Sequence, residues 1–535
     1  MWTEGWRDRI WSQLNEEWDL IIIGGGITGA GVLREAVARG LKTLLVEARD
    51  FSFGTSSRSS KLVHGGIRYL RNKQYNVTRE SVQEREWMLK EARGLVTPLG
   101  FMMPNLASSG TPNWKLHLGV MIYDYFGRKW AHRAYSRAGF LRANPEINPD
   151  QLVGGFLYYD ARMDDSRLVL RVIREAVAAG GTAINDARVV DLLRNQSGAV
   201  CGVVLRDEAA PEKCCAEVRA RVVINASGPW SDELRQKVGA PARLRKLRGS
   251  HLVFERSRLP LQQAVTILHP KDNRAMFAIP WEGTLLIGTT DLDHPREWDD
   301  REPFATGEEI AYILEAANHV FPGVHLAESD IVSTFSGLRP VVNTGKAHPS
   351  QESRAHVVWE EAGLLTITGG KLTTFRLMAK EVLQKAASRL PGTPDFTPRV
   401  RIFDPLPAIE TARAAGLSPA DLLYLQGRYG ADTADLLAAA APGELESIAG
   451  LPNRWVELRW AARAEGVQHL DDLLLRRVRL GLLLPQGGLG ELARIRAMVQ
   501  PELGWDDARW DAEEAAYRRI WQQSYSPAPT GVNAG

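Results

Sequence analysis

The glycines of the segment GGGITG have the spacing of a nucleotide-binding turn. Gly24, Gly26 and Gly29 form the pattern G-x-G-x-x-G between an apolar run and a helical pattern. The first glycine permits a tight turn, the second lets backbone approach a pyrophosphate, and the third lets helix pack on strand. Glu47 follows about twenty residues later, where an acid accepts hydrogen bonds from the ribose hydroxyls of an adenine nucleotide. These residues predict a dinucleotide site, but the motif alone does not distinguish NAD from FAD.

The elements around this motif predict a strand-helix-strand unit. Residues 19–23 are too continuously apolar to alternate, so they suit a strand that is buried on both faces. Residues 27–39 have helical spacing and end at Gly40, and residues 42–46 form a second apolar strand. Such a unit indicates a parallel sheet, in which ligands bind outside the carboxyl ends of the strands.

Two later segments are expected to end at the same edge of that sheet. Residues 221–225 run into ASGPW and residues 364–368 run into GGKLTT, so each apolar strand ends in a glycine turn. Three such strand ends suggest that the chain wraps a long cofactor. GGKLTT also resembles a helix start, whose positive end would stabilise the anion of a reduced isoalloxazine. This arrangement favours flavin over nicotinamide.

The remaining pattern predicts an α/β fold with further parts. Residues 275–291 read as two strands around a Glu282-Gly283 turn, and GSHLVF and TFSGLRPVV are also strand-like, which indicates an antiparallel sheet interleaved with the parallel one. Ser418 and Pro419 start a capped helix, and LDDLLLRRVRLGLLL reads as one buried helix. We expect an amphipathic segment at 1–17, an FAD-binding Rossmann-like domain at 18–390 with an interleaved substrate domain at roughly 75–150 and 235–345, a linker at 391–398, an all-α domain at 399–523 and a disordered tail at 524–535.

Composition limits the class of protein. The 535 residues carry a net charge of +2, so the balance of charge does not argue for a nucleic-acid partner, which would leave a strongly basic domain or stripe. Three cysteines are too few and too clustered for a disulfide framework and fit a reducing cytoplasm. No apolar run reaches the roughly 18 to 20 residues that cross a bilayer, and no signal peptide is visible. No motif assigns metal ligands.

The first eighteen residues contain four of the sixteen tryptophans. Trp2, Trp6 and Trp11 form an apolar stripe at helical spacing with Ile10 and Leu14. One interpretation is a helix that lies in a membrane interface, and the other is a helix docked on the protein's own surface. The polar face mixes acids and bases, which favours docking.

Several segments together resemble a known family. They are DLIIIGGGITGAG, TSSRSSKLVHGGIRYL, DARMDDSRLV, NASGPW, GSHLVF, FAIPW, GTTD, SGLRP and GGKLTT. In these segments, which span roughly residues 18–380, the chain resembles the FAD-dependent glycerol-3-phosphate dehydrogenases of the glycine-oxidase-like flavoproteins. The segments SSKLVHGGIRYL, SGLRP and GGKLTT are the specific ones, whereas many flavoproteins share the glycine motif. RRVRLGLL is the best match in the C-terminal part.

The resemblance implies an activity and partners. sn-Glycerol 3-phosphate would lose its C2 hydrogen as hydride to FAD and its hydroxyl proton to a base, and dihydroxyacetone phosphate would leave. The electrons would pass to a quinone in the membrane, so the protein would be cytoplasmic with peripheral contact to the inner face of the cell membrane. A homodimer is plausible for this family.

The resemblance also assigns site residues. A phosphate dianion and a developing alkoxide need several cations close together. Arg68, Tyr69, Arg339, Arg354 and Lys371 would bind substrate, and Arg339, Lys371 and His251 would act in catalysis. Arg339 stays charged and so serves as an electrostatic stabiliser. His251 has a suitable intrinsic pKa for the base, although a structural histidine is an equal alternative. The cofactor would be held by Gly24, Gly26, Gly29, Glu47, Thr55, Ser56, Ser59, Ser60, Lys61, His64, Gly65, Gly66, Val189, Gly228, Trp230, Gly370, Leu372 and Thr373.

Two rival functions stay open on the sequence. A glycerol-3-phosphate oxidase would use oxygen in place of quinone; known oxidases carry an inserted segment in the substrate half, which we do not identify in this chain. A non-catalytic flavin-binding sensor could use the C-terminal helices as an interaction module. The set of cations argues against a sensor, and also against an amine oxidase, which would favour an apolar cage with one arginine.

Overall fold

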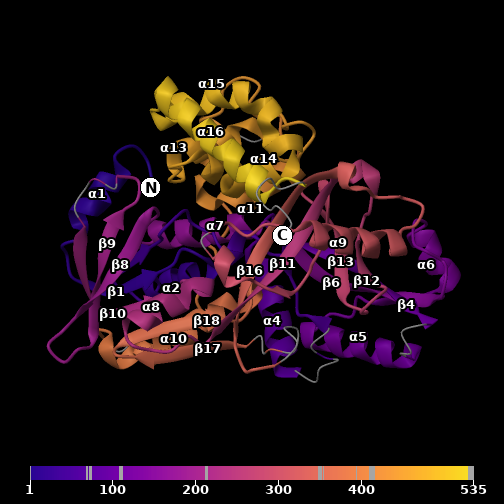
Figure 1. Ribbon diagram of the computed structural model, residues 1–535, viewed down its shortest axis with the longest axis horizontal. Coiled ribbons are helices and arrows are strands. Elements are labelled where there is room, and N and C mark those ends of the chain that lie inside the picture. Colours follow the sequence, from indigo (N-terminus) through magenta and orange to yellow (C-terminus); the bar gives the residue numbers. More distant parts are fainter. Residues whose placement is uncertain are drawn as a thin grey trace.

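The computed structural model describes residues 2–67, 70, 75–107, 112–210, 212, 215–299, 301–346, 352, 355–392, 394–408 and 416–527. Figure 1 shows two sheets side by side, with the C-terminal helices packed together on one side of them. The chain passes between the two sheets several times, so the sheets are interleaved in sequence. The predicted fold class, an α/β sheet with an interleaved antiparallel sheet and a helical C-terminal part, is confirmed.

The first sheet has a parallel centre. From edge to edge its strands are β17 (His356–Glu361), β18 (Leu364–Gly369), β10 (Ala216–Asn225), β1 (Trp18–Ile23), β2 (Thr43–Val46) and β7 (Thr182–Ile184). All neighbours pair in parallel except β17 with β18, and an antiparallel ribbon of β8 (Ala187–Arg194) and β9 (Val200–Asp207) continues from β10. β2 is buried along its whole length, which explains why its sequence is continuously apolar.

Helices cover the first sheet. They are α2 (Ile27–Val37), α7 (Asp165–Ala178), α8 (Ser231–Lys237) and α10 (Phe375–Ala386). α2 begins directly after the glycine turn and packs between α7 and α10. The predicted strand-helix-strand unit is therefore present, and the helix start predicted for GGKLTT is the short turn Leu372–Thr374 that leads into α10.

The second sheet is antiparallel except where β12 lies parallel to β4. Its strands are β15 (Leu292–Asp293), β11 (Leu244–Glu255), β14 (Thr284–Gly288), β13 (Ala275–Trp281), β12 (Ala264–Leu268), β4 (Val96–Leu106), β6 (Leu152–Met163) and β3 (Leu62–Val63), with β16 (Ile331–Val342) beside β11 and β5 (Arg133–Ser136) beside β6. The predicted hairpin at 275–291 is confirmed, and both turn residues, Glu282 and Gly283, have positive φ. The helices α4 (Tyr75–Glu91), α5 (Asn113–Gly127), α6 (Arg137–Ala143) and α9 (Gly307–Val320) surround this sheet.

The C-terminal part is helical and contains one departure from prediction. Its helices are α11 (Pro419–Tyr429), α12 (Thr433–Ala438), α13 (Trp455–Ala464), α14 (Leu480–Leu483), α15 (Leu492–Leu503) and α16 (Asp507–Ser524). Ser418 caps α11 as predicted, because its hydroxyl accepts from the Asp421 N–H. The single helix expected at LDDLLLRRVRLGLLL is wrong: a π-helical turn at Asp472–Arg477 is followed by Arg479 in the left-handed region, at φ 67°.

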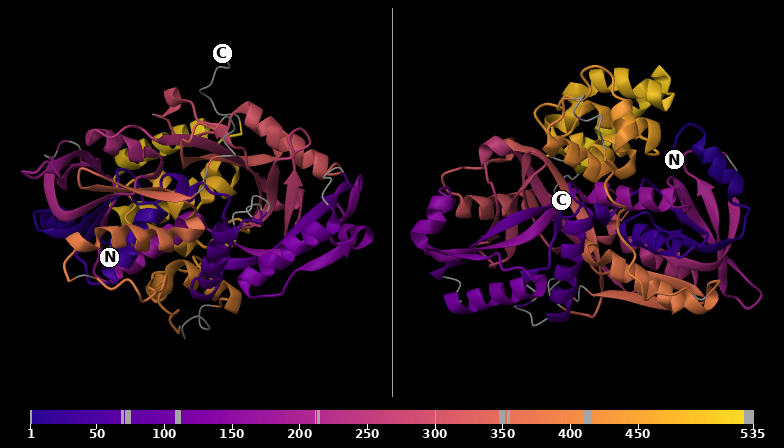
Figure 2. Two further views of the ribbon diagram at one scale, coloured as in Figure 1. Left: turned by 90° about the horizontal axis from the view of Figure 1, so that it is seen from below. Right: turned by 180° about the vertical axis from the view of Figure 1, so that it is seen from behind.

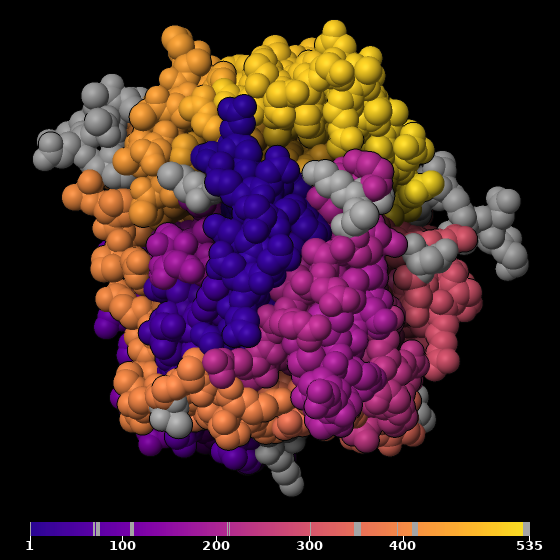
Figure 3. Space-filling view, turned by 90° about the vertical axis from the view of Figure 1, so that its left-hand side faces the viewer, coloured from indigo at the N-terminus to yellow at the C-terminus, as the bar shows by residue number. Residues whose placement is uncertain are grey.

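Both ends of the described chain pack on the body of the protein. α1 (Trp6–Gln13) follows Trp2, whose indole donates to Ala183 O at 3.0 Å, and both Trp2 and Trp6 are buried. Figure 3 shows the N-terminal residues in indigo, beside magenta residues and below the yellow C-terminal helices. The disordered tail predicted from residue 524 is wrong for its first residues, because Tyr525 is buried and its carbonyl accepts from Thr334 N at 2.7 Å. Residues 528–535 lie outside the described residues.

Candidate active site

A cavity of about 2080 Å³ lies where the strand ends of the first sheet face the second sheet. This volume is roughly twice the upper end of the ~300–1,000 Å³ range typical of small-molecule pockets. Residues that follow β1, β2, β10 and β18 line it, together with residues of β16 and α5. The cavity therefore suits a ligand much longer than one nucleotide.

The glycine turn forms one part of the cavity wall. Gly24, at φ 116°, and Gly26 line the cavity, and Gly26 precedes the first turn of α2 without a side-chain cap. The Ile27 N–H donates to Ser56 Oγ at 2.9 Å, so a loop hydroxyl lies at the positive end of the helix. Gly29 does not line the cavity: a Cβ atom there would lie 1.9 Å from Gly24 O, which makes it the glycine of close packing.

Glu47 lies in the cavity wall at the end of β2. Its Oε2 accepts from Gly25 N at 2.7 Å and its Oε1 from Arg49 N at 2.9 Å, so the backbone fixes the carboxylate. Burial raises the pKa of Glu47, and the two backbone hydrogen bonds oppose that shift. The Glu47 carbonyl accepts from Ala187 N, which brings Val189 of β8 into the same wall.

The polar segment after Glu47 divides between cavity and core. Six of its predicted cofactor residues line the cavity, namely Thr55, Ser56, Ser59, Ser60, His64 and Gly66. Lys61 and Gly65, which were also predicted to line the flavin, do not line the cavity. A Cβ at Gly65 would lie 2.2 Å from Val82, and the Gly65 N–H donates to Tyr123 Oη at 2.8 Å, so this glycine serves packing.

Lys61 is fully buried behind the wall. Its Nζ lies 2.9 Å from Asp165 Oδ1 and donates to Ser57 O at 2.5 Å. Burial, together with the neighbouring charge of Arg479, lowers the pKa of Lys61 to about 7, while Asp165 opposes the shift. Lys61 therefore holds the backbone of this polar segment from the side that faces away from the cavity.

The ends of β10 and β18 complete the cofactor side of the cavity. The predicted residues Gly228, Trp230, Gly370, Leu372 and Thr373 all line it. Thr368 Oγ1 donates to Gly228 O at 3.2 Å, which joins the two strand ends. A Cβ at Gly54 would lie 2.8 Å from the Trp230 ring, so the loop and the tryptophan already touch.

Arg339 on β16 lies in the wall and is held from behind. Its Nη1 lies 2.8 Å from Asp291 Oδ1, and its Nη2 donates to Thr289 Oγ1 at 3.3 Å. The other oxygen of Asp291 lies 3.0 Å from Arg274 Nη2, and Arg274 also lines the cavity. We did not predict Arg274 from the sequence. The acid that ends GTTD was the available signal, because a buried carboxylate requires cationic partners.

The other predicted catalytic residues lie at different depths. Lys371 lines the cavity, and its Nζ donates to Ser81 Oγ on α4 at 3.1 Å. His251 is buried behind the wall, where its Nε2 lies 2.9 Å from Ser60 Oγ and its ring stacks on Phe335. Burial lowers the pKa of His251 well below its usual value, and Arg339 and Lys61 add to the shift. Among the described residues, the hydrogen-bond partner of His251 is Ser60, which lines the cavity.

Three of the predicted substrate residues, Arg68, Tyr69 and Arg354, lie outside the described residues. Among the described residues, no cluster of three acids, histidines or cysteines has the geometry of a metal site. In the same part of the chain, no helix combines the length and the apolar character needed to cross a bilayer.

The lining residues fit FAD. A glycine turn and an uncapped helix start suit a pyrophosphate, and the fixed carboxylate of Glu47 suits ribose hydroxyls. Small hydroxyl residues, glycines and the turn before α10 line the rest, which leaves room for a flat ring next to backbone. The size of the cavity suits the two joined halves of this cofactor.

Comparisons of sequence point to the same cofactor. The family model of FAD dependent oxidoreductases matches residues 19–382, and the model of the C-terminal domain of alpha-glycerophosphate oxidase matches residues 385–510. The chain is 38% identical to glycerol-3-phosphate dehydrogenase 2 of Mycobacterium tuberculosis over 548 residues, which cover 98% of this chain and 92% of that protein. It is 35% identical to the aerobic glycerol-3-phosphate dehydrogenase of Staphylococcus haemolyticus over 492 residues, covering 86% and 87% of the two chains.

Solved structures share the fold. The glycerol-3-phosphate dehydrogenase of Bacillus halodurans complexed with FAD matches with a TM-score of 0.78 and 29% identity, covering 99% of this chain and 100% of that one. The FAD-bound L-alpha-glycerophosphate oxidase of Mycoplasma pneumoniae matches with a TM-score of 0.57 and 18% identity, covering 74% and 100%, which shows a common fold alone. FAD is the cofactor of this protein, and the chain belongs to the FAD-dependent glycerol-3-phosphate dehydrogenases within the FAD-dependent oxidoreductase family.

Proposed function

We propose that this protein oxidises sn-glycerol 3-phosphate to dihydroxyacetone phosphate and passes the electrons to a membrane quinone. The observation that carries the proposal is that three cations, Arg339, Arg274 and Lys371, line the same cavity as the cofactor residues. Asp291 holds both arginines in place. Several cations that line one site suit a phosphate dianion better than a neutral or cationic substrate.

The cations have separate roles, because different neighbours hold each of them in place. When bound, FAD supplies the hydride acceptor. Arg339 is fixed by Asp291 and Thr289, so its guanidinium meets the substrate without reorganising, and it stabilises negative charge on the C2 oxygen or the phosphate. Lys371 is positioned by Ser81 and adds a second fixed charge.

The proton of the C2 hydroxyl goes to a base in the wall. His64 lines the cavity, whereas His251 lies behind Ser60. The lowered pKa of His251 also makes it a weak proton acceptor near neutral pH. We therefore assign the base to His64 and give His251 the role of orienting Ser60.

The quinone acceptor is supported by an exposed apolar face on α5. Trp114, Leu118, Met121 and Tyr125 recur at helical spacing on one side of the helix, and Trp114 and Tyr125 are 64% and 70% exposed. Trp114 and Leu118 also line the cavity, so this face borders its opening. Exposed aromatic residues beside a cavity mark a surface that meets lipid or another apolar body.

The charge around α5 fits an anionic membrane. Between residues 112 and 143 the one acid is Asp124, which is buried against His132. The same stretch carries six cations, Lys115, Arg128, Lys129, Arg133, Arg137 and Arg142. Each cation near an anionic leaflet contributes about 1 kcal/mol. Trp2 and Trp6 are buried, so we place the membrane contact on α5 and not on α1, with the protein at the inner face of the cell membrane.

An anaerobic titration tests the activity. Glycerol 3-phosphate is added to the purified, flavin-loaded protein, and the oxidised flavin absorbance should bleach in proportion to dihydroxyacetone phosphate formed. Glycerol and glycerol 2-phosphate are the matched controls and should leave the spectrum unchanged. Unbleached flavin with glycerol 3-phosphate would reject the proposal.

A second experiment separates the acceptors. Peroxide yield in air is compared with the rate of reduction of a short-chain quinone analogue by the same preparation. A dehydrogenase gives fast quinone reduction and little peroxide, whereas stoichiometric peroxide would favour the oxidase. The homodimer implied by the resemblance stays a prediction, which light scattering of the purified protein tests.

A further inference from the structure

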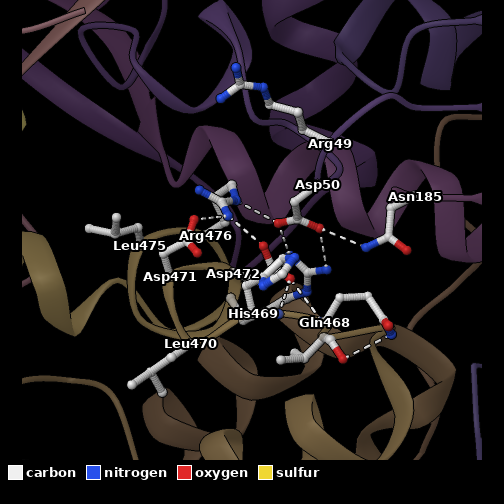
Figure 4. Close-up of polar contacts among 12 residues, drawn as sticks. Arg49, Asp50, Asn185, Gln468, His469, Leu470, Asp471, Asp472, Leu475 and Arg476 are labelled. Atoms are coloured by element: carbon white, nitrogen blue, oxygen red, sulfur yellow. Dashed lines mark hydrogen bonds and ion pairs between the residues drawn. The ribbon is translucent and has the colours of Figure 1, made fainter. Parts of the chain in front are cut away.

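The side chains of the segment 48–61, which follows Glu47, face in two opposite directions. Arg49, the run 53–56 and the run 58–60 line the cavity. Asp50, Ser57 and Lys61 are buried and do not line it. Figure 4 shows Arg49 directed away from the C-terminal helices and Asp50 directed toward Arg476.

Asp50 is bound by two consecutive arginines of the C-terminal part. Arg477 donates Nη1 to Oδ2 at 2.6 Å and Nη2 to Oδ1 at 2.7 Å, and Arg476 Nε donates to Oδ2 at 2.5 Å. Asn185 Nδ2 adds a hydrogen bond to Oδ1 at 3.1 Å. Burial alone would raise the pKa of Asp50, but Arg477 and Arg476 lower it to about 2. The carboxylate is therefore ionised and fully paired at neutral pH.

A third arginine of the C-terminal part, Arg479, reaches the same segment at Ser57. Its Nη2 donates to Ser57 O at 2.8 Å and to Asp165 Oδ1 at 3.0 Å. The other oxygen of Asp165 accepts from Ser59 N at 2.9 Å and Ser59 Oγ at 2.7 Å. Arg479 thus acts on the backbone of a cavity-lining turn, both directly and through Asp165.

The irregular backbone of the C-terminal segment brings these arginines together. On a regular α-helix, Arg476, Arg477 and Arg479 would point in different directions because successive residues turn by about 100°. Here the backbone is not a regular α-helix, because it forms a π-helical turn at Asp472–Arg477 and is left-handed at Arg479. The three side chains therefore reach neighbouring parts of the same segment. π-Helical turns occur often at functional sites. All three side chains are buried, so the contacts are shielded from water.

We propose that Arg476, Arg477 and Arg479 are positioning residues, through which the C-terminal helices fix the wall of the flavin cavity. The role of the C-terminal part is then to retain the cofactor, and it acts from the side of the segment that the cofactor does not touch. The inference rests on FAD binding in this cavity, and it is independent of the substrate and the electron acceptor.

The buried charges explain why the contact is needed for retention. Removing one partner of a buried ion pair leaves the other charged and desolvated, so the segment has to move to regain water. A displaced segment moves the hydroxyls of Thr55, Ser56, Ser59 and Ser60 that line the cavity. The expected defect is therefore weaker FAD binding, while the reacting groups Arg339 and Lys371 keep their own contacts.

The test compares Arg477→Gln and Asp50→Asn with Arg174→Gln in the full-length protein. Arg174 also joins α7 to the C-terminal part, through Asp432, but contacts no residue of the segment. FAD is removed, and the dissociation constant is measured by titrating FAD and following flavin fluorescence. We expect the constant to rise about tenfold or more for Arg477→Gln and Asp50→Asn, and to stay within about twofold of wild type for Arg174→Gln.

A double variant and an exchange experiment complete the test. Asp50→Asn combined with Arg477→Gln should weaken FAD binding less than the sum of the single changes, because both remove one contact. If the single variants do not fold, Arg477→Lys keeps the charge but loses the paired geometry. Hydrogen exchange of residues 48–61 should then be faster than in wild type, while exchange in β1 is unchanged. Wild-type FAD affinity in Arg477→Gln, or unchanged exchange of this segment in Arg477→Lys, would overturn the proposal.

Discussion

Arg339 Nη1 lies 2.8 Å from Asp291 Oδ1, and the carboxylate is completely buried behind the cavity wall. The same acid holds Arg274 through its other oxygen at 3.0 Å. One carboxylate therefore sets the direction of two cations that face the proposed substrate.

Asp291→Asn should lower kcat/KM for glycerol 3-phosphate by roughly thirtyfold. Losing a charged hydrogen bond costs about 2 kcal/mol, and the two arginines would also repel each other. Steady-state kinetics check this, with Asp330→Asn as the control, because Asp330 pairs with Arg258 on the surface. Equal kinetics of the two variants would contradict the role of Asp291.

Lys371→Ala should retain FAD and lose about a hundredfold or more in kcat/KM, because a preorganised cation is removed from the site. The measurement is steady-state turnover together with the flavin-to-protein absorbance ratio. Lys385→Ala on α10, where Lys385 is a surface residue beside Glu381, is the matched control. Near-wild-type turnover of Lys371→Ala would remove this residue from the site.

His64→Gln and His251→Gln should differ in their pH profiles. The acid limb of kcat/KM belongs to the base, so it should disappear in His64→Gln. It should persist in His251→Gln, where the contact to Ser60 and the stacking on Phe335 are lost. Stopped-flow flavin reduction between about pH 5.5 and 9 gives the profiles. Loss of the limb in His251→Gln alone would return the base to His251.

Lys61→Met should change how stability depends on pH. Burial lowers the pKa of Lys61 to about 7 in the folded protein, against 10.5 when exposed. Between these values the unfolded chain binds the extra proton, so the wild type gains stability as pH rises from 7 toward 10.5, by up to about 1.4 kcal/mol per pH unit. Urea unfolding at about pH 7 and about pH 9 should show this gain in wild type and its loss in Lys61→Met. Parallel pH dependence of the two proteins would contradict a lowered pKa.

Trp114→Gln combined with Tyr125→Gln should reduce co-sedimentation with anionic vesicles by about tenfold or more, because two exposed aromatic side chains lose their interfacial site. Activity with a water-soluble electron acceptor is measured in parallel, because Trp114 also lines the cavity. Leu292→Gln, at another exposed apolar position on β15, is the control. Figure 1 and the rear view in Figure 2 place α5 on the side of the molecule away from the yellow C-terminal helices, so those helices would face the solvent. Unchanged sedimentation of the α5 variant would move the contact elsewhere.

The sequence predicted the elements whose signal is local. The glycine turn, the Glu282-Gly283 hairpin and the Ser418 cap each depend on residue types within a few positions, and all three are present. Lys61 and Gly65 were predicted to line the flavin, whereas neither lines the cavity. Polarity in that segment does not reveal which side chains face a buried acid and which face a cofactor.

The features that the sequence did not reveal share a cause, which is contact between segments that are distant in the chain. His251 reaches Ser60 across the two sheets, and Arg274 shares Asp291 with Arg339. At the break in the predicted helix, Arg479 contacts Asp165, an acid more than three hundred residues earlier in the chain. Tertiary ion pairs of this kind override helix propensity, and a single sequence does not display them.

The order of strands has a consequence for biosynthesis. β1 pairs with β10, β10 with β18, and the segment after β2 with Arg477, so the cofactor cavity and its support draw on residues from Gly24 to Arg479. Nearly the whole chain therefore has to be synthesised and leave the ribosome before the cavity can close. Stable flavin capture is expected as a late, post-translational event, and nascent chains that stop before the C-terminal arginines should emerge without their yellow colour.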